Sequence, residues 1–271
     1  MSANRGKVLT IAGSDSGGGA GIQADIKTIT ALGGYATTAI TALTAQNTLG
    51  VHFVFEVPAS FVQQQIDVVL TDIGTHAVKT GMLMNKEIVE VVTLKVQEYG
   101  IACVIVDPVM LSKNGKRLLS PDAMNDLIRK LFPLSFLVTP NIPEAEYIAN
   151  KKIKNPRDMK EVARYIHGLG PSHVLIKGGH AERLHGSDKV IDILYNGSRF
   201  LEIEGEYIPT DNTHGTGCTY ASAIATYLAK GQKITDAVMQ AKKFVTLSIK
   251  RSFNPGRGYG TLDQFGAAQF P

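Results

Sequence analysis

The sequence predicts a three-layer α/β fold, in which helices cover both faces of a mostly parallel sheet with an antiparallel edge. Short runs of β-branched and apolar residues alternate with amphipathic stretches, which is the pattern of βα units. Hydrophobic residues make up 44% of the 271 residues and charged residues 19%, so the chain can bury a sizeable core. We find no internal repeat and no linker rich in Pro, Gly or Ser. We therefore expect one domain over residues 1–271, with or without a small flap.

Six buried strands and seven helices are expected from these patterns. Each strand is a short run of apolar and β-branched residues, and each helix is an amphipathic stretch. The strands are expected at Lys7–Ala12, Ala36–Thr41, Ala77–Thr80, Ala102–Asp107, Phe136–Thr139 and His173–Lys177. The helices are expected at Gly21–Leu32, Pro58–Leu70, Lys86–Tyr99, Pro121–Leu131, Pro156–Leu169, Cys218–Ala229 and Ile234–Ser252.

The antiparallel edge is expected between Lys189 and Ile208. Short strands there are separated by Asn196-Gly197-Ser198 and by Gly205, and Asn-Gly is typical of a hairpin turn. Exposed edge strands in the range 192–203 could form a contact between two copies of the chain. The tail at 254–271 is rich in Gly and polar residues and is expected to close over the core without regular structure. Its GRGYG segment (256–260) matches no motif, and we assign it no role.

Composition excludes several classes of protein. The formal charge is +4, from 28 Lys and Arg against 24 Asp and Glu, and the basic residues are dispersed, so we expect no nucleic acid and no membrane partner. The first apolar stretch reaches Asp15 too soon for a signal peptide or a spanning helix, which makes the cytoplasm the expected compartment. Only Cys103 and Cys218 are present, without metal-ligand spacing, so neither a disulfide scaffold nor a zinc site is indicated.

Four polar or glycine-rich segments follow predicted strands, where open α/β sheets bind ligands. The first is GSDSGGGAG (13–21), whose glycines allow the backbone to approach a flat ring; the alternative is a flexible turn. We also predict Asp25, on the following helix, as a substrate contact. A GxGxxA pattern is present at 19–24, but no acidic residue lies near position 40 to hold a ribose, so a dinucleotide site is disfavoured. No GxxxxGK[ST] segment occurs, which excludes a P-loop.

The second and third segments carry acidic residues. Asp107 ends an apolar strand that Pro108 prevents from continuing, so its carboxylate either approaches Mg²⁺ or caps a turn. Asn141 and Glu144 are three residues apart at a helix start, where they either orient Mg²⁺ and phosphate or form a capping box. Lys177 ends another strand and either meets ATP phosphates or caps that strand.

The fourth segment, DNTHGTGC (211–218), opens a helix of small residues. Successive amides at such a glycine-rich N-terminus form an anion site, which suits a transferring phosphoryl group. Cys218 lies in the first turn, where the helix dipole is expected to lower its pKa and make it a base or a hydrogen-bond partner. We interpret His214 as a loop or backbone partner and place Cys103 in the core.

These segments together resemble the hydroxymethylpyrimidine and phosphomethylpyrimidine kinases of thiamine biosynthesis, a branch of the ribokinase-like superfamily. The resemblance runs over nearly the whole chain and rests on seven motifs in order. They are AGSDSGGGAGIQAD (12–25), TALTAQNT (41–48), KTGML (79–83), DPVM (107–110), TPNIPEA (139–145), KGGH (177–180) and THGTGCT (213–219).

The resemblance implies a ribokinase-like fold, ATP and Mg²⁺ as cofactors, a small pyrimidine substrate and a homodimer. It implies that the GTGC segment is the anion hole with its catalytic cysteine, which assigns these roles to Gly215, Thr216, Gly217 and Cys218. It implies a Mg²⁺ and phosphate element around the NxxE segment, with Asn141 and Lys177 on the nucleotide and Asp107 and Glu144 on the metal. Around the pyrimidine ring it implies Gly13, Ala20, Gln46, Met82 and Val109.

Two alternative functions remain open. Cysteine-type pyridoxal kinases share the GSDS loop and the GxGC element but tend to carry Met where this chain has Gln46, so Gln46 favours the pyrimidine. A carboxamide can donate to a ring nitrogen and accept from an exocyclic amine. A pyrimidine-binding protein without catalysis is disfavoured, because it needs no anion hole beside a metal carboxylate. For the kinase, we expect in-line transfer in which Cys218 deprotonates or orients the hydroxymethyl group.

Overall fold

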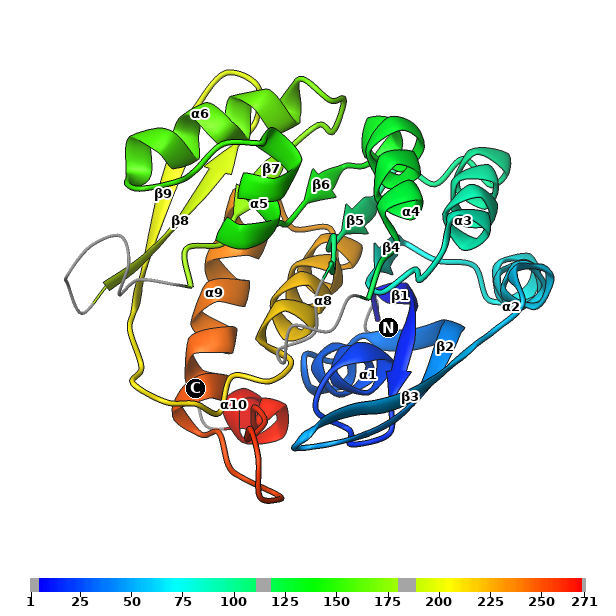
Figure 1. Cartoon of the computed structure of the whole chain (residues 1–271), viewed down its shortest axis with the longest axis horizontal. Coiled ribbons are helices and arrows are strands. Elements are labelled where there is room, and N and C mark those ends of the chain that lie inside the picture. Colours follow the sequence, from blue (N-terminus) through cyan, green and yellow to red (C-terminus); the bar gives the residue numbers. More distant parts are fainter. Residues whose placement is uncertain (1–4, 111–117, 180–188, 270–271) are drawn as a thin grey trace.

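A sheet of nine strands forms the centre of the molecule in the part that the computed structural model describes, residues 5–110, 118–179 and 189–269. The strand order is β3-β2-β1-β4-β5-β6-β7-β8-β9 (Figure 1). The strands are β1 Lys7–Asp15, β2 Tyr35–Asn47, β3 Gly50–Glu56, β4 Ala77–Thr80, β5 Val104–Val106, β6 Leu137–Val138, β7 Val174–Ile176, β8 Lys189–Tyr195 and β9 Phe200–Glu206.

The sheet is mostly parallel, as predicted. In the row β2-β1-β4-β5-β6-β7 each strand runs parallel to the next. Three pairs are antiparallel: β3 with β2, β8 with β7, and β9 with β8. The predicted antiparallel edge at 189–208 is therefore confirmed, but β3 forms a second one at the opposite side. Only β9 of the predicted hairpin is an edge strand, because β8 lies between β7 and β9.

Helices cover both faces of the sheet (Figure 1). The helices α1, α8, α9 and α10 pack on one face, and α2 to α6 pack on the other, each layer with its own apolar core. The helices are α1 Gly21–Ala31, α2 Ala59–Asp72, α3 Lys86–Glu98, α4 Pro121–Asp126, α5 Ile142–Ala149, α6 Pro156–His167, α8 Thr216–Ala229, α9 Ile234–Lys250 and α10 Gln264–Gln269. A π-helical turn, Leu127–Leu131, and a 3₁₀ turn, Phe132–Leu134, follow α4.

Local sequence explains where several helices begin. Asn85 caps α3 by accepting a hydrogen bond from the Ile88 amide, and Asn155 caps α6 in the same way, just before Pro156. By contrast, α8 starts after Gly215, which has no capping side chain. Because the first amides of a helix have no acceptor within it, this helix start is suited to an external anion.

Three elements differ from the sequence expectations. β2 continues to Asn47 and turns back into β3, although the polar residues Thr44 and Gln46 interrupt the apolar pattern. The tail at 254–271 was expected to lack regular structure, but α10 forms at 264–269. Its sequence, QFGAAQ, is too short to show helical periodicity, and the buried Gly266 and Ala267 let it pack closely against α1 and α9. α5 was expected only as a helix start at Asn141.

Two remaining expectations concern membrane-spanning helices and predicted residues outside the described ranges. Among the described residues, no helix is both long and apolar enough to cross a membrane. His180, the last residue of the KGGH motif, and the last two residues of the tail lie outside the described residues.

Candidate active site

One cavity of about 890 Å³ lies at the carboxyl ends of the parallel strands. Segments that follow β1, β4, β5, β6 and β7 contribute to its wall, together with the start of α8. The cavity is lined by thirteen of the fourteen predicted site residues, namely Gly13, Ala20, Gln46, Met82, Asp107, Val109, Asn141, Glu144, Lys177, Gly215, Thr216, Gly217 and Cys218. The fold thus brings together residues that are more than 200 positions apart in the sequence.

Asp25 is the predicted site residue that does not line the cavity. Its side chain is fully buried and forms an ion pair with Lys79, which is also fully buried, at 2.9 Å. It also accepts hydrogen bonds from the hydroxyl groups of Thr10, at 2.5 Å, and Ser222, at 2.7 Å. Burial acts to lower the pKa of Lys79, but the Asp25 carboxylate raises it above its ordinary value. Asp25 therefore occupies the position of a buried counter-ion behind the cavity wall.

Glycines shape the start of α8. Gly215 has a φ of +86°, and a Cβ there would lie 1.9 Å from the carbonyl oxygen of Gly19. A Cβ on Gly217 would lie 3.4 Å from both Asp107 Oδ2 and Lys177 Nζ. Gly215 lets the chain pass close to the Gly19 carbonyl, and Gly217 places the first turn of α8 beside Asp107 and Lys177. A glycine-rich helix start beside an ammonium is suited to a phosphate.

Lys177 and Asp107 form an ion pair in the wall of the cavity. Lys177 Nζ donates to Asp107 Oδ1 at 2.6 Å, and the Thr139 hydroxyl donates to the same oxygen at 3.1 Å. Burial acts to lower the pKa of Lys177, but Asp107 and Glu144 raise it above its ordinary value. Lys177 is therefore a permanent cation beside the start of α8, able to compensate developing phosphoryl charge.

Asn141 and Glu144 form a capping box and also line the cavity. The Asn141 side chain accepts from the Glu144 amide at 2.9 Å, and Glu144 Oε2 accepts from the Asn141 amide at 2.8 Å. The capping box is thus present at the cavity wall, and it is compatible with the predicted contact of these residues with Mg²⁺ and phosphate. Burial raises the pKa of Glu144 to about 7, and the Asp107 carboxylate adds to this effect, while Lys177 opposes it.

The Cys218 thiol differs from its sequence expectation. We expected the helix start to lower its pKa, but burial raises that pKa to about 11. Lys79 and the amide of Gly21 favour the thiolate, whereas the carboxylates of Asp25 and Asp107 oppose it. The thiol is therefore protonated at neutral pH, which suits a hydrogen-bonding role better than that of a resting base.

Small residues make space at the other end of the cavity. A Cβ on Gly13 would lie 2.2 Å from Met82 Cε, so these two predicted ring contacts are neighbours and a larger residue at position 13 would displace the end of the Met82 side chain. The Thr41 hydroxyl donates to the carbonyl of Met82 at 2.6 Å and fixes the backbone that carries it. A flat ring can enter between such walls.

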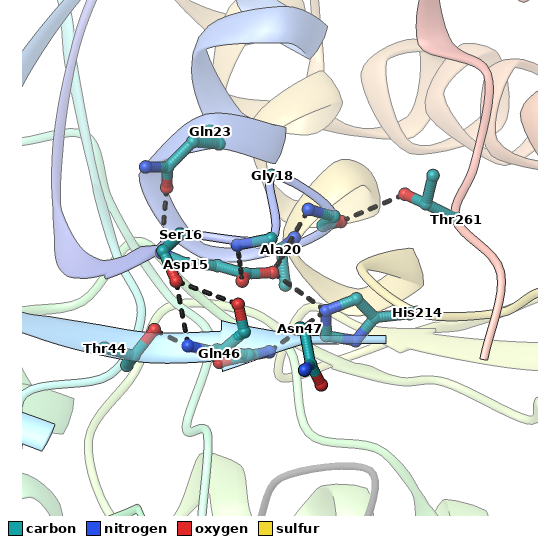
Figure 2. A network of polar contacts seen from close by, with 12 residues as sticks. Asp15, Ser16, Gly18, Ala20, Gln23, Thr44, Gln46, Asn47, His214 and Thr261 are labelled. Atoms are coloured by element: carbon teal, nitrogen blue, oxygen red, sulfur yellow. Dashed lines mark hydrogen bonds and ion pairs between the residues drawn. The ribbon is translucent and has the colours of Figure 1, made fainter. Parts of the chain in front are cut away.

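The sequence interpretation missed a polar network beside Gln46 (Figure 2). Asp15 lies at the end of β1 and pairs with the His214 side chain, Oδ2 to Nε2, at 2.9 Å. The same ring nitrogen lies 3.2 Å from the Gln46 carboxamide. We interpreted His214 as a loop or backbone partner, and its amide does donate to the carbonyl of Gly260 at 3.2 Å; the side-chain contacts come in addition. The signal was the acidic residue in the GSDS loop, which only the fold brings to His214.

The GRGYG segment also has a place at the site. The Gly258 amide donates to Thr48 Oγ1 at 3.1 Å, and the Tyr259 amide donates to the carbonyl of Thr48 at 3.0 Å. Thr48 belongs to the turn between β2 and β3, one residue after the strand that carries Gln46. The tail thus holds this turn, and both Thr48 and Tyr259 line the cavity.

The donor set fits a nucleotide and a hard cation. Along β8, α9 and the segment after β9, the cavity is lined by Val190, Ile208, Val245 and Ile249, an apolar wall suited to a base. The carboxylates of Asp107 and Glu144 are oxygen ligands of the kind that Mg²⁺ prefers, completed in such sites by phosphate and water. In the described ranges no group of three or more His, Cys, Asp or Glu side chains is placed so that it could hold a metal ion, so a site made wholly of protein ligands is not indicated there.

Comparisons with known proteins agree with this geometry. A family model described as phosphomethylpyrimidine kinase matches residues 15–263. The chain is 46% identical to the hydroxymethylpyrimidine/phosphomethylpyrimidine kinase of Bacillus subtilis, with 96% of this chain and 94% of that protein covered. It is 49% identical to a bifunctional thiamine biosynthesis protein of Geobacter sulfurreducens, with 98% of this chain but only 53% of that protein covered. The chain thus spans about half the length of this bifunctional relative.

Solved structures give the same fold. A Bacillus subtilis pyridoxal kinase in an ADP complex superposes with a TM-score of 0.89 at 36% identity, covering 98% of this chain and 100% of that one. The likeness to this kinase confirms the expected ribokinase-like architecture, and that related protein binds ADP.

Proposed function

The chain belongs to the phosphomethylpyrimidine kinase family, and from that premise we propose that it phosphorylates 4-amino-5-hydroxymethyl-2-methylpyrimidine and then its monophosphate, with ATP as donor. It is a phosphotransferase of thiamine biosynthesis. The proposal is carried by one observation: the cavity joins a ring pocket with a carboxamide, Gln46, to a glycine-rich helix start beside Lys177.

The residues supply positioning and electrostatics. In the first transfer the substrate hydroxyl attacks the γ-phosphorus in line, its proton passes to an oxygen of the transferred phosphoryl group and the bond to ADP breaks. In the second transfer an oxygen of the monophosphate is the attacking group. Negative charge builds on the transferring group in both. The amides of Gly215, Thr216 and Gly217 and the Lys177 ammonium stabilise that charge. Cys218 orients the hydroxymethyl group by hydrogen bonding, because its thiol is protonated at neutral pH.

Mg²⁺ is part of the proposal, with Asp107 and Glu144 as the residues that hold it. The cation would neutralise charge on the ATP oxygens. Asn141, whose side chain is fixed by the capping box, contacts the nucleotide phosphates.

The test is incubation of the purified protein with ATP and Mg²⁺, with the hydroxymethylpyrimidine and pyridoxal in separate tubes and products identified by mass. Pyrimidine mono- and diphosphate are the expected products. The Cys218→Ala variant tests the role of the thiol: it should bind the pyrimidine but phosphorylate it slowly. Full turnover by this variant would contradict the role given to the thiol.

Pyridoxal kinase is the second candidate, because the pyridoxal kinase of Bacillus subtilis has the same fold over almost the whole chain. Phosphorylation of pyridoxal alone would keep the fold and the transfer site but remove the role of Gln46 in pyrimidine recognition. A pyrimidine-binding protein without catalysis would be revived if the pyrimidine bound tightly and neither tube contained a phosphorylated product.

We also propose one kinase domain over residues 1–271, a homodimer and a cytoplasmic location. Exposed aromatic side chains on β3 support a contact between copies, since Phe53 is 76% and Phe55 66% exposed. Asp192, in the range expected to make this contact, is only 1% exposed and does not support it. Light scattering of the purified protein would give the oligomeric state, and a monomeric mass would refute the dimer.

A further inference from the structure

Three side chains from distant parts of the chain meet at one ring nitrogen in the wall of the cavity (Figure 2). His214 Nε2 lies 2.9 Å from Asp15 Oδ2 and 3.2 Å from one end of the Gln46 carboxamide. The other end of that carboxamide lies 3.3 Å from Thr44 Oγ1. The transfer chemistry described above uses neither His214 nor Asp15.

Asp15 is an acceptor in this network. Its Oδ1 accepts from the Gly17 amide at 2.8 Å, and its Oδ2 accepts from the amides of Gly19 at 3.1 Å and Ala20 at 2.9 Å. Burial acts to raise the pKa of Asp15, but His214 and these amides lower it below its ordinary value. An ionised carboxylate has no proton to give, so the proton between the two side chains belongs to His214 Nε2.

Thr44 constrains the other end of the carboxamide. Its single hydroxyl proton has a carbonyl acceptor, the oxygen of Ser14, at 2.9 Å. Since a carbonyl can only accept, Thr44 donates to Ser14 and presents lone pairs toward Gln46. The end of the Gln46 carboxamide that faces Thr44 is therefore best occupied by the NH₂ group.

The two neighbours thus select the same orientation of Gln46. The single N–H of His214 donates to Asp15, so Nε2 has no lone pair for an amide N–H and can share its proton only with the carboxamide oxygen. The lone pairs of Thr44 require the carboxamide nitrogen. The two ends of a carboxamide have the same shape, so their hydrogen-bond partners decide the orientation. In the reverse orientation, drawn in Figure 2, the amide nitrogen would face the His214 N–H and set two donors against each other.

This orientation matters because the substrate has an orientation of its own. The hydroxymethyl group has to point toward Cys218 and the start of α8. This fixes the order of the exocyclic amine, on the neighbouring ring carbon, and the ring nitrogen beyond it along the adjacent edge of the ring. A carboxamide turned the other way would meet donor with donor and acceptor with acceptor. Pyridoxal has no exocyclic amine, so it gains less from an oriented carboxamide.

We propose that His214, held by Asp15, is a positioning residue that fixes the Gln46 carboxamide and so sets the preference for an aminopyrimidine over pyridoxal. The proposal rests on the proposed function, which supplies the pyrimidine. It assigns His214 a role in specificity and not in phosphoryl transfer. Its effect should therefore appear in the KM for the pyrimidine and not in the KM for ATP.

The test compares three variants of His214 that differ in whether, and at which position of the former ring, the new side chain carries an N–H group. In His214→Gln the amide nitrogen can occupy the place of Nε2, in His214→Asn it stands nearer the place of Nδ1, and in His214→Leu there is none. We expect His214→Leu and His214→Asn to raise the KM for the pyrimidine roughly ten- to a hundredfold, the range for a mismatched buried hydrogen bond. His214→Gln should restore most of the affinity, and pyridoxal should be affected less.

His76 provides the control, because it is exposed and lies at the amino end of β4, whereas the cavity lies at the carboxyl ends of the strands. His76→Leu should leave both KM values unchanged. Equal losses for pyrimidine and pyridoxal, an unchanged pyrimidine KM in His214→Leu, or no difference between His214→Gln and His214→Asn would each overturn the proposal.

Calorimetry with the pyrimidine alone separates this proposal from the proposed function. A wild-type protein that binds the pyrimidine but does not phosphorylate it would remove the function, while the affinities of the three variants would still test His214. A wild-type protein that does not bind the pyrimidine would overturn both. The Gln and Asn variants keep the comparison available if His214→Leu does not fold.

Discussion

Replacing Asp25 by Asn tests whether this residue holds the fold or contacts the substrate. Its partner Lys79 has no exposed surface, and nor does Asp25. The substitution leaves the Lys79 ammonium buried without its counter-ion, which costs about 3–5 kcal/mol in such pairs. For a domain of this size, 1 kcal/mol corresponds to roughly 2–4 °C in Tm, so the Tm should fall by roughly 6–20 °C.

The measurement is thermal unfolding followed by circular dichroism, combined with steady-state kinetics at a temperature where the variant is folded. The double variant Asp25→Asn/Lys79→Met should recover much of the loss, because neither charge is then buried alone. Glu204→Gln is the matched control: it breaks the surface pair with Lys189, whose two side chains are 57% and 62% exposed, and should cost less than about 1 kcal/mol.

One result would refute the reasoning. If Asp25→Asn unfolds at the wild-type temperature while the KM for the pyrimidine rises tenfold or more, Asp25 contacts the substrate, as the sequence first suggested. The buried ion pair would then contribute little to stability.

Three further predictions concern the cavity. Because the pKa of Glu144 is about 7, its carboxylate becomes protonated as the pH falls through that value, and kcat/KM for ATP with Mg²⁺ should decline about tenfold per pH unit below pH 7. The pH–rate profile should show an inflection near pH 7 that is absent in Glu144→Gln. An inflection near pH 4.5 would contradict the argument that burial raises this pKa. Because the pKa of Cys218 is about 11, its alkylation by iodoacetamide should accelerate steadily from pH 7 to 10, and a plateau below pH 8 in peptide mass spectra would reveal a thiolate. In Gly258→Ala the new Cβ would lie 2.0 Å from the carbonyl oxygen of Thr48, so the tail should detach and the KM for the pyrimidine should rise severalfold. The control Gly168→Ala, where the nearest atom to the new Cβ is 3.2 Å away, should leave this KM unchanged. Equal KM values in the two variants would show that the tail does not shape the site.

The parallel part of the fold could be predicted because its strands are buried on both faces. A run such as VLTIA in β1 is buried throughout and apolar except for Thr10, and the residues that follow each strand are polar or glycine. The ribbon of β2 and β3 lacks this signal. Phe53 and Phe55 alternate as in a half-covered strand, but they are largely exposed, and the polar positions of β2 face the site.

The site could be predicted where one segment carries its own chemistry. The start of α8 needs only its glycines, and the capping box needs only Asn141 and Glu144. The role of Asp25 could not be predicted, because its partner Lys79 approaches it only in the folded chain. The pKa of Cys218 could not be predicted either, because it is raised mainly by burial, which the local sequence does not show. The same holds for His214, whose partner Asp15 lies 199 residues away in the sequence.

The contact between Thr48 and Gly258 also has a consequence for how the protein is made. These residues are 210 positions apart, and the Thr261 hydroxyl likewise reaches back to the carbonyl of Gly19 across 242 positions. A ribosome that adds 5–20 residues per second needs roughly 10–40 s to span such a distance. The nascent chain therefore carries its first glycine-rich loop and the β2–β3 turn long before the residues that hold them exist. The ring pocket can therefore be completed only after most of the sheet is available to fold.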